Sequence, residues 1–187
     1  MKNWTLRQRI LASFAVIITI MLLMVVVSYS RLLKIEAGEE RMRSDAIPGV
    51  YFSSMIRGSW VDSYLRTQAI LGLDEGKGVT AQDEADFKSF EQRLQKYMAS
   101  YKETLRGESD LREFNEFEQH HQNLLAVLVN ILDLHRRNQN AEAIRLFHEQ
   151  MTPTWVAGRM KLNDIIEENK GVADSAAAQI DDAVLAA

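Results

Sequence analysis

Residues 111–135 read LREFNEFEQHHQNLLAVLVNILDLH and indicate the fold class more clearly than any other stretch of the chain. Side chains of similar character return every three or four residues, which is the period of an α-helix that buries one face. This stripe consists of Leu111, Phe114, Glu118, His121, Leu125, Leu128, Leu132 and His135. Further apolar residues widen the same face, namely Leu124, Val127, Ile131 and Leu134. The stretch therefore predicts a long helix that packs against other helices.

Two more helical segments flank this one. On its N-terminal side, Thr80 is expected to cap a helix, whose heptad seam is Phe87, Phe90, Leu94, Tyr97, Tyr101 and Leu105. On its C-terminal side, Asn140 is expected to cap a helix that runs to the end of the chain. The stripe of that helix is Ile144, Phe147, Met151, Gly158, Leu162, Ile165, Asn169, Val172 and Ala176. Glycines at positions 72, 76, 78 and 107 separate the segments.

The segment from residue 31 to residue 71 carries two stripes at helical spacing. The first contains Ile35, Met42, Ala46, Gly49, Ser53, Ile56, Trp60 and Ser63. The second contains Val50, Ser54, Arg57, Val61, Tyr64, Gln68 and Leu71. Two stripes predict two neighbours, for example a bundle core and a second subunit. The small residues of the first stripe suit either a weakly packed interface that can shift or ordinary close packing. Pro48 is expected to kink the helix or end a turn.

The predicted fold is all-α, an antiparallel up-down-up-down four-helix bundle preceded by one transmembrane helix. Short connections between long helices make successive helices antiparallel, which favours this arrangement. The chain has no cysteine, and this excludes disulfides, Cys-based zinc sites and thiol nucleophiles. The net charge is −4 with both signs interspersed, which argues against a nucleic-acid partner.

Residues 10–29 read ILASFAVIITIMLLMVVVSY and carry no charge. About 20 apolar residues at 1.5 Å each span the ~30 Å hydrocarbon core of a bilayer. Such a span must be helical in lipid, and the hydroxyls of Ser13, Thr19 and Ser28 can bond back to its backbone. A cleaved signal peptide is the alternative, but the apolar stretch is longer than usual and lacks a small-residue cleavage site.

Basic residues before this span predict a cytoplasmic N-terminus. We accordingly divide the chain into a cytoplasmic N-terminus (1–9), a transmembrane helix (10–30) in the bacterial inner membrane, and a periplasmic four-helix-bundle sensor domain (31–187). Four antiparallel helices return the chain to the membrane. A second transmembrane helix and a signalling domain are therefore expected beyond residue 187.

This layout resembles the sensor half of methyl-accepting chemotaxis receptors over essentially the whole chain. The matching features are Ile47-Pro48-Gly49 early in the first sensor helix, Arg57 and Arg66 on that helix, and Pro153-Thr154 early in the fourth. In amino-acid-sensing members, the matching arginines hold ligand carboxylates across a dimer interface, and the fourth-helix segment holds the amino group. Asp62 stands where those members have another arginine, so their amino-acid specificity is not carried over.

The resemblance also implies partners. It predicts a homodimer formed through the first sensor helix, a histidine kinase and a coupling protein reached through the cytoplasmic part, and a small carboxylate as a possible ligand. The stretches MKNWTLRQRI at 1–10 and SMIRGSWVDSYL at 54–65 are similar to surface-sensing members of the family. Those members feed a phosphorelay that controls the synthesis of cyclic di-GMP.

The candidate ligand-binding residues are Arg57, Trp60, Tyr64 and Arg66, together with Thr152, Thr154 and Trp155. A guanidinium beside aromatic rings suits a carboxylate ligand. Nine residues turn a helix by about 900°, so Arg57 and Arg66 can serve one site only where two copies of the helix meet. The alternative is structural: Arg66 forms an ion pair with Asp62 four residues away, and Trp60 packs at an interface.

Metal and enzyme sites find little support in the sequence. The spacing of Glu118 and His121 matches half of a di-iron bundle site, which requires a second Glu-x-x-His that the sequence lacks. His121 and His135 lie on an apolar stripe, where a core histidine is commoner than a haem ligand. We predict no metal and no cofactor. The sequence contains no hydrolase triad, phosphate loop or nucleotide fingerprint, so we predict that the chain is not an enzyme.

Three functions stay open at this point. The chain could serve a transducer that responds to surface contact or envelope stress, a chemoreceptor that binds a small carboxylate, or a sensor kinase or cyclic-nucleotide enzyme that uses the same input domain. We take the first as the prediction. The expected mechanism is a population shift between two packings of a dimer, passed on as a small sliding or rotation of helices.

Overall fold

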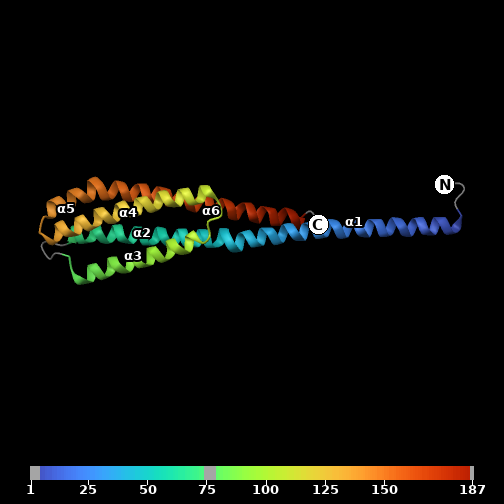
Figure 1. Cartoon of the computed structure of the whole chain (residues 1–187), viewed down its shortest axis with the longest axis horizontal. Coiled ribbons are helices and arrows are strands. Elements are labelled where there is room, and N and C mark those ends of the chain that lie inside the picture. The colour runs from blue at the N-terminus through green and yellow to red at the C-terminus, as the bar shows by residue number, and fades with distance from the viewer. Residues whose placement is uncertain (1–4, 74–78, 186–187) are drawn as a thin grey trace. The chain divides into compact units, whose positions relative to one another are not determined.

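The computed structural model describes residues 5–73 and 79–185, and Figure 1 shows its helices. In chain order these are α1 (Leu6–Arg41), the π-helical turn η1 (Met42–Ala46), α2 (Ile47–Leu73), α3 (Ala81–Lys102), α4 (Glu108–Arg136), α5 (Asn140–Leu146), the π-helical turn η2 (Phe147–Met151) and α6 (Thr152–Leu185). The described residues contain no β-strand. The predicted breaks at Gly76 and Gly78 lie outside the described residues.

The chain divides into two compact units. Residues 43–173 form one unit, and the described parts of 1–42 and 174–187 form the other. Within the larger unit, α2, α3, α4 and the continuous helical segment α5–η2–α6 run alongside one another and alternate in direction (Figure 1). This confirms the predicted up-down-up-down four-helix bundle.

Of the two helix caps predicted from the sequence, one is confirmed and one is wrong. Thr80 caps α3 as predicted: its Oγ1 accepts from the Asp83 backbone nitrogen at 3.2 Å, and Asp83 Oδ2 accepts from the Thr80 nitrogen at 2.9 Å. The cap predicted at Asn140 was wrong, because Asn140 is the first residue of α5 and Gln139 precedes it without a side-chain cap. The chain reverses instead at Asn138, whose φ is 60°, a left-handed conformation that asparagine tolerates.

The core of the larger unit is aromatic at its centre. Its largest fully buried apolar side chains are Trp60, Phe114, Phe117, Ile56, Ile131, Met151 and Leu162. The Trp60 ring meets Phe117 edge to face, with 5.2 Å between ring centroids, a geometry that aromatic pairs prefer. The predicted stripes of α2, α4 and the last helix supply all of these residues except Phe117, which the sequence analysis did not place on a stripe. Leu111, which was predicted to lie on the α4 stripe, is 46% exposed.

Small residues bring α2 and α6 into close contact. A Cβ atom built on Gly158 would lie 2.5 Å from Trp60 Cζ2, and one built on Gly49 would lie 2.1 Å from Asn169 Oδ1. Both distances are below any ordinary carbon contact. Of the two readings of the first α2 stripe, the structure supports close packing within one subunit. The second stripe is exposed or half-buried, and its contact with a second subunit stays a prediction.

A buried polar pair lies beside this contact. The Nδ2 atom of Asn169 donates to the Tyr101 hydroxyl at 2.9 Å and to the Ile165 carbonyl at 2.8 Å. Burial raises the pKa of Tyr101 to about 12, although the hydrogen bond from Asn169 acts against it. The phenol therefore stays neutral and links α3 to α6, which satisfies two polar groups that would be costly to bury alone.

Each proline of the chain follows a π-helical turn by two residues. Pro48 comes after η1 and Pro153 after η2. A proline has no N–H to give to the carbonyl four residues earlier, and for Pro48 that carbonyl belongs to Ser44. It accepts from Arg106 Nη2 at 3.4 Å. The predicted disturbance at Pro48 thus takes the form of a π turn just before it.

The π turn η2 also explains an error in the predicted stripe of the last helix. Ile144 was predicted to be buried but is 39% exposed, whereas Ala143 is fully buried. In a regular α-helix, the residue two turns before Met151 on the same face is Ile144. The extra residue of the π turn shifts the buried position to Ala143.

The smaller unit contains the apolar span. Within the described residues, one helical stretch, Leu6–Gly72, is long and apolar enough to cross a membrane, and its apolar window is entirely exposed. Ser13 Oγ donates to the Arg9 carbonyl at 3.0 Å and Thr19 Oγ1 to the Ala15 carbonyl at 2.8 Å. These bonds confirm that the two hydroxyls are satisfied by the helix itself. The cytoplasmic, membrane and periplasmic boundaries stay predictions.

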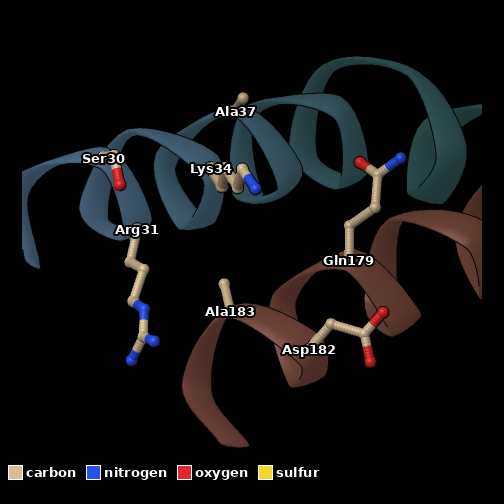
Figure 2. A pocket seen from close by; sticks show the side chains of 7 residues that line it. All are labelled: Ser30, Arg31, Lys34, Ala37, Gln179, Asp182 and Ala183. Carbon is tan, nitrogen blue, oxygen red and sulfur yellow. The ribbon is translucent and has the colours of Figure 1, made fainter. Parts of the chain in front are cut away.

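The end of α6 packs on α1 in this unit. A Cβ on Gly38 would lie 2.7 Å from Ile180 Cγ1. Figure 2 shows the neighbouring pocket of about 570 Å³, lined by Ser30, Arg31, Lys34, Ala37, Gln179, Asp182 and Ala183. Its α1 wall carries two basic side chains and its α6 wall an acidic one (Figure 2). The lining therefore favours no single ligand charge.

The contact between α2 and α6 gives a stability prediction. We expect Gly158→Ala to lower the free energy of unfolding by about 1–3 kcal/mol, because the new methyl group overlaps the buried Trp60 ring. The matched control is Gly171→Ala on the same helix, where nothing lies within 4 Å of the new Cβ. It should raise stability by up to about 1 kcal/mol through helix propensity. Urea unfolding of the chain in detergent micelles measures both, and equal effects of the two changes would contradict the close contact.

Candidate functional site on helices α2 and α6

Two tryptophans join α2 to α6 by a reciprocal pair of hydrogen bonds. Trp60 Nε1 donates to the Trp155 carbonyl at 3.2 Å, and Trp155 Nε1 donates to the Trp60 carbonyl at 3.3 Å. Trp60 is fully buried and Trp155 is half-buried. The Trp60 carbonyl also accepts from Ser63 Oγ at 3.0 Å. Since indole has one donor, both rings are satisfied by this contact alone.

Tyr64 extends the contact by one turn. Its ring stacks on Trp155 with 4.2 Å between centroids and on Phe147 with 5.1 Å. Its hydroxyl lies 3.2 Å from Thr152 Oγ1, which also donates to the Phe147 carbonyl at 3.0 Å. The stack therefore fixes the π turn that ends at Met151. Stacked aromatic pairs contribute about 0.5–1.5 kcal/mol beyond their burial.

Two arginines lie on the exposed side of the tryptophan pair. Arg57 Nη1 donates to Asn163 Oδ1 at 3.3 Å, and the guanidinium carbon of Arg159 lies 5.0 Å from the Trp155 ring centroid. Trp155, Arg159 and Asn163 stand four residues apart, so they share one face of α6. Within residues 5–73 and 79–185, neither guanidinium has a carboxylate partner closer than 4.0 Å. This face can accept an anion.

Arg66 faces a different neighbour. Its Nη2 lies 2.6 Å from Asp83 Oδ1 and 3.1 Å from Asp86 Oδ2, at the start of α3. The structural alternative predicted an ion pair between Arg66 and Asp62. An ion pair does form, but the predicted partner was wrong. The three-residue step from Asp83 to Asp86 puts both carboxylates on the same side of α3. The structure separates Arg66 from Arg57, which engages α6, as the half-turn phase difference requires.

The two threonines around Pro153 both bind the helix backbone. Thr154 Oγ1 donates to the Gln150 carbonyl at 2.8 Å, as Thr152 does to the Phe147 carbonyl. Of the predicted residues, the structure brings together Trp60, Tyr64, Thr152 and Trp155, with Arg57 beside them. The sequence analysis missed Phe147, Arg159 and Asn163 as members. The four-residue spacing that starts at Trp155 was the signal for the last two.

The histidine and glutamate residues considered as metal ligands have other partners. Glu118 Oε1 lies 2.7 Å from Lys102 Nζ, and His121 Nε2 lies 3.2 Å from Glu91 Oε1. The described part of the chain holds no group of three His, Asp or Glu side chains suited to a metal ion. His121 is buried in the core, in ring contact with Trp60 and Phe117.

A family model described as a four helix bundle sensory module for signal transduction matches residues 3–184. The chain belongs to this family. The match covers the bundle and the apolar span together, and it confirms the expected sensory module of methyl-accepting-chemotaxis-type transducers. The comparison with curated proteins and the comparison with solved structures find no match.

The ion pair at the start of α3 gives a pH prediction. Burial acts to raise the pKa of Asp83, but the hydrogen bonds from Thr80 and the guanidinium of Arg66 together hold it below its usual 3.8. A carboxyl group whose pKa is lower in the folded state than in the unfolded state stabilises the fold at any pH above its unfolded-state pKa. This stability is lost as the pH falls through the folded-state pKa. We expect Asp83→Asn to cost about 1–3 kcal/mol at pH 7.

The difference between wild type and Asp83→Asn should vanish as the pH is lowered below 3.8. Calorimetric unfolding between pH 7 and pH 2 measures it. The matched control is Asp62→Asn, an exposed aspartate of α2, which should change stability by less than about 0.5 kcal/mol. A cost for Asp83→Asn that stays constant down to pH 2 would show that its charge is not involved.

Proposed function

We propose that this sensory module serves a membrane transducer that responds to surface contact or envelope stress and controls a phosphorelay to cyclic-di-GMP synthesis. The proposal rests on the resemblance of residues 1–10 and 54–65 to the transducer of the Wsp surface-sensing pathway. One structural observation supports it most. The centre of the α2–α6 contact is filled by two mutually hydrogen-bonded tryptophans, which suits transmission of force better than recognition of a solute.

The proposed mechanism is a small displacement of α6 along α2. Sliding or rotation of α6 strains the two hydrogen bonds that the indole N–H groups donate. It also strains the stacking of Tyr64 on Trp155. Each hydrogen bond contributes about 1 kcal/mol, so a modest external bias can change the population of the two packings. The π turns η1 and η2 are places where a helix can gain or lose one residue of register.

The assembly around the module is proposed on the same basis. The module acts as a homodimer through the first sensor helix, with its bundle in the periplasm. It reaches a histidine kinase and a coupling protein through a cytoplasmic part, and it has no catalytic activity of its own. The exposed apolar residues Ile47, Tyr51 and Leu65 of α2 support the dimer, because Arg57 and Tyr64 of the second stripe already contact α6.

The test uses the native receptor in its own bacterium with a fluorescent cyclic-di-GMP reporter, before and after transfer from liquid to a surface. Trp155→Phe keeps a ring but removes one indole donor, which shifts the balance of packings by about 1 kcal/mol, or roughly fivefold in population. We expect the surface-induced rise in signal to change by up to that factor. Met160→Ala, an exposed residue of α6, is the control and should behave as wild type.

Two outcomes overturn parts of the proposal separately. A surface response that survives deletion of the receptor gene shows that the module serves another input. A response that needs the receptor but is unchanged by Trp155→Phe shows that the signal does not pass through the tryptophan contact.

A second candidate function has one observation in its favour. Arg57 and Arg159 flank the aromatic stack without a carboxylate partner among the described residues. Such a pair of guanidinium groups suits a small carboxylate, which would lie beside Trp155 rather than between Arg57 and Arg66. The module would then act as a chemoreceptor sensor.

A thermal-shift screen of the chain in micelles tests this function against organic acids, amino acids and aromatic carboxylates. A ligand at 100 times its Kd adds about 2.7 kcal/mol of stability, a shift of a few degrees. Arg57→Ala and Arg159→Ala should each abolish the shift. Arg145→Ala should not, because that arginine pairs with Glu142 and Glu149 elsewhere on the surface. No shift with any compound would remove this candidate.

A further inference from the structure

The pocket between α1 and the end of α6, in the smaller unit, carries charges of both signs (Figure 2). Its volume of about 570 Å³ is within the range of about 300–1,000 Å³ that small-molecule sites occupy. The α1 wall contributes Arg31 and Lys34, and the α6 wall contributes Asp182 and the carboxamide of Gln179. None of the residues that line this pocket belongs to the candidate site on α2 and α6.

The charged groups of the pocket do not neutralise one another. Within the described part of the chain, neither Arg31 nor Lys34 has a carboxylate closer than 4.0 Å, and Asp182 has no cationic side chain within that distance. The hydroxyl of Ser30 is already used, because it donates to the Val27 carbonyl at 2.8 Å. The pocket therefore offers two positive groups on one wall and one negative group on the other, which a ligand can bridge.

The position of the pocket along α1 corresponds to the level of lipid headgroups. The polar layer on each side of the ~30 Å hydrocarbon core is about 5–7 Å thick. At 1.5 Å per residue, Arg31 and Lys34 follow the predicted span of residues 10–30 by about 2–6 Å. On α6, the residues directly after the pocket are Val184 and Leu185, which are 54% and 85% exposed. Both walls therefore carry their charges beside exposed apolar surface, as a headgroup site requires.

The two walls match the two charges of one kind of phospholipid. A phosphodiester accepts charge-assisted hydrogen bonds from guanidinium and ammonium groups such as those of Arg31 and Lys34. A primary ammonium group donates up to three hydrogen bonds, which the Asp182 carboxylate and the Gln179 carboxamide oxygen can accept. A purely anionic headgroup would be repelled by Asp182, and a trimethylated ammonium has no hydrogen to donate. A headgroup with a phosphodiester and a primary ammonium group satisfies both walls.

We propose that this pocket binds the headgroup of a zwitterionic phospholipid with a primary ammonium group, of which phosphatidylethanolamine is the simplest. The phosphate lies against Arg31 and Lys34, the ammonium group lies against Asp182, and the acyl chains run along the apolar span. The bound headgroup thereby joins α1 to the end of α6 at the membrane surface. The inference rests on the predicted transmembrane helix and is independent of the proposed surface-sensing function.

Native mass spectrometry of the whole chain, residues 1–187, tests this proposal. The micelles contain equal amounts of dioleoyl phosphatidylethanolamine, phosphatidylcholine and phosphatidylglycerol, which share their chains and phosphate and differ only in the group that follows. We expect about threefold more bound phosphatidylethanolamine than either other lipid, an effect in the range of one exposed ion pair. Glycerophosphoethanolamine has the same headgroup without acyl chains, and at equal concentration it should not displace the lipid.

Adjacent aspartates of α6 provide the matched pair of variants. Asp182→Asn removes the carboxylate of the pocket and should abolish the preference over phosphatidylcholine. Asp181→Asn makes the same change at an exposed neighbour that does not line the pocket, and it should keep the preference. On α1, Arg31→Gln should lower the binding of all three lipids. Arg41→Gln, at an exposed residue outside the pocket, should not.

The contrary outcomes are distinct. A preference for phosphatidylglycerol would mean that the site selects an anionic lipid, and equal binding of phosphatidylethanolamine and phosphatidylcholine would mean that the ammonium group is not recognised. A preference that survives Asp182→Asn would place the recognition outside the pocket. Displacement by glycerophosphoethanolamine would make the ligand a soluble molecule, and the absence of any bound lipid would contradict the transmembrane helix as well. Each of these results overturns the proposal.

Discussion

The close approach of α2 to α6 is the constraint on which the rest of the bundle depends. Gly158 leaves room for the Trp60 ring and Gly49 leaves room for Asn169, so the two backbones come near enough to exchange hydrogen bonds through their tryptophans. Once α2 and α6 are in contact, α3 and α4 complete the bundle by packing on the apolar faces that these two helices leave uncovered. The buried amide and phenol of Asn169 and Tyr101 then hold α3 in register.

Much of this fold follows from helical periodicity. The stripes of α2, α3 and α4 and the cap at Thr80 were predictable because each depends on residues close in sequence. The position of Ile144 was not, because a π turn inserts one residue into the repeat and nothing in the local sequence marks it except a proline two residues later. Which stripe of α2 faces its own bundle could not be derived either. That choice depends on the contact with α6, about a hundred residues away.

The candidate site shows the same division. Trp60, Tyr64, Thr152 and Trp155 were identified from the sequence, and the structure brings them together. Arg66 was assigned the wrong partner, because an aspartate four residues away is the obvious choice on an isolated helix. In the folded chain, Arg66 instead forms ion pairs with Asp83 and Asp86 at the start of α3, and Asp83 is the more buried of the two. Arg159 was missed because its role depends on the ring beneath it rather than on its own neighbours in sequence.

The tryptophan contact also gives the molecule an intrinsic optical probe. Two of its three tryptophans exchange hydrogen bonds across one helix interface, and a tyrosine stacks on one of them. Indoles held at fixed distance and angle couple their electronic transitions, which gives strong near-ultraviolet circular dichroism. Any stimulus that moves α6 relative to α2 therefore changes a signal that can be recorded on the unlabelled protein, in a membrane and in real time.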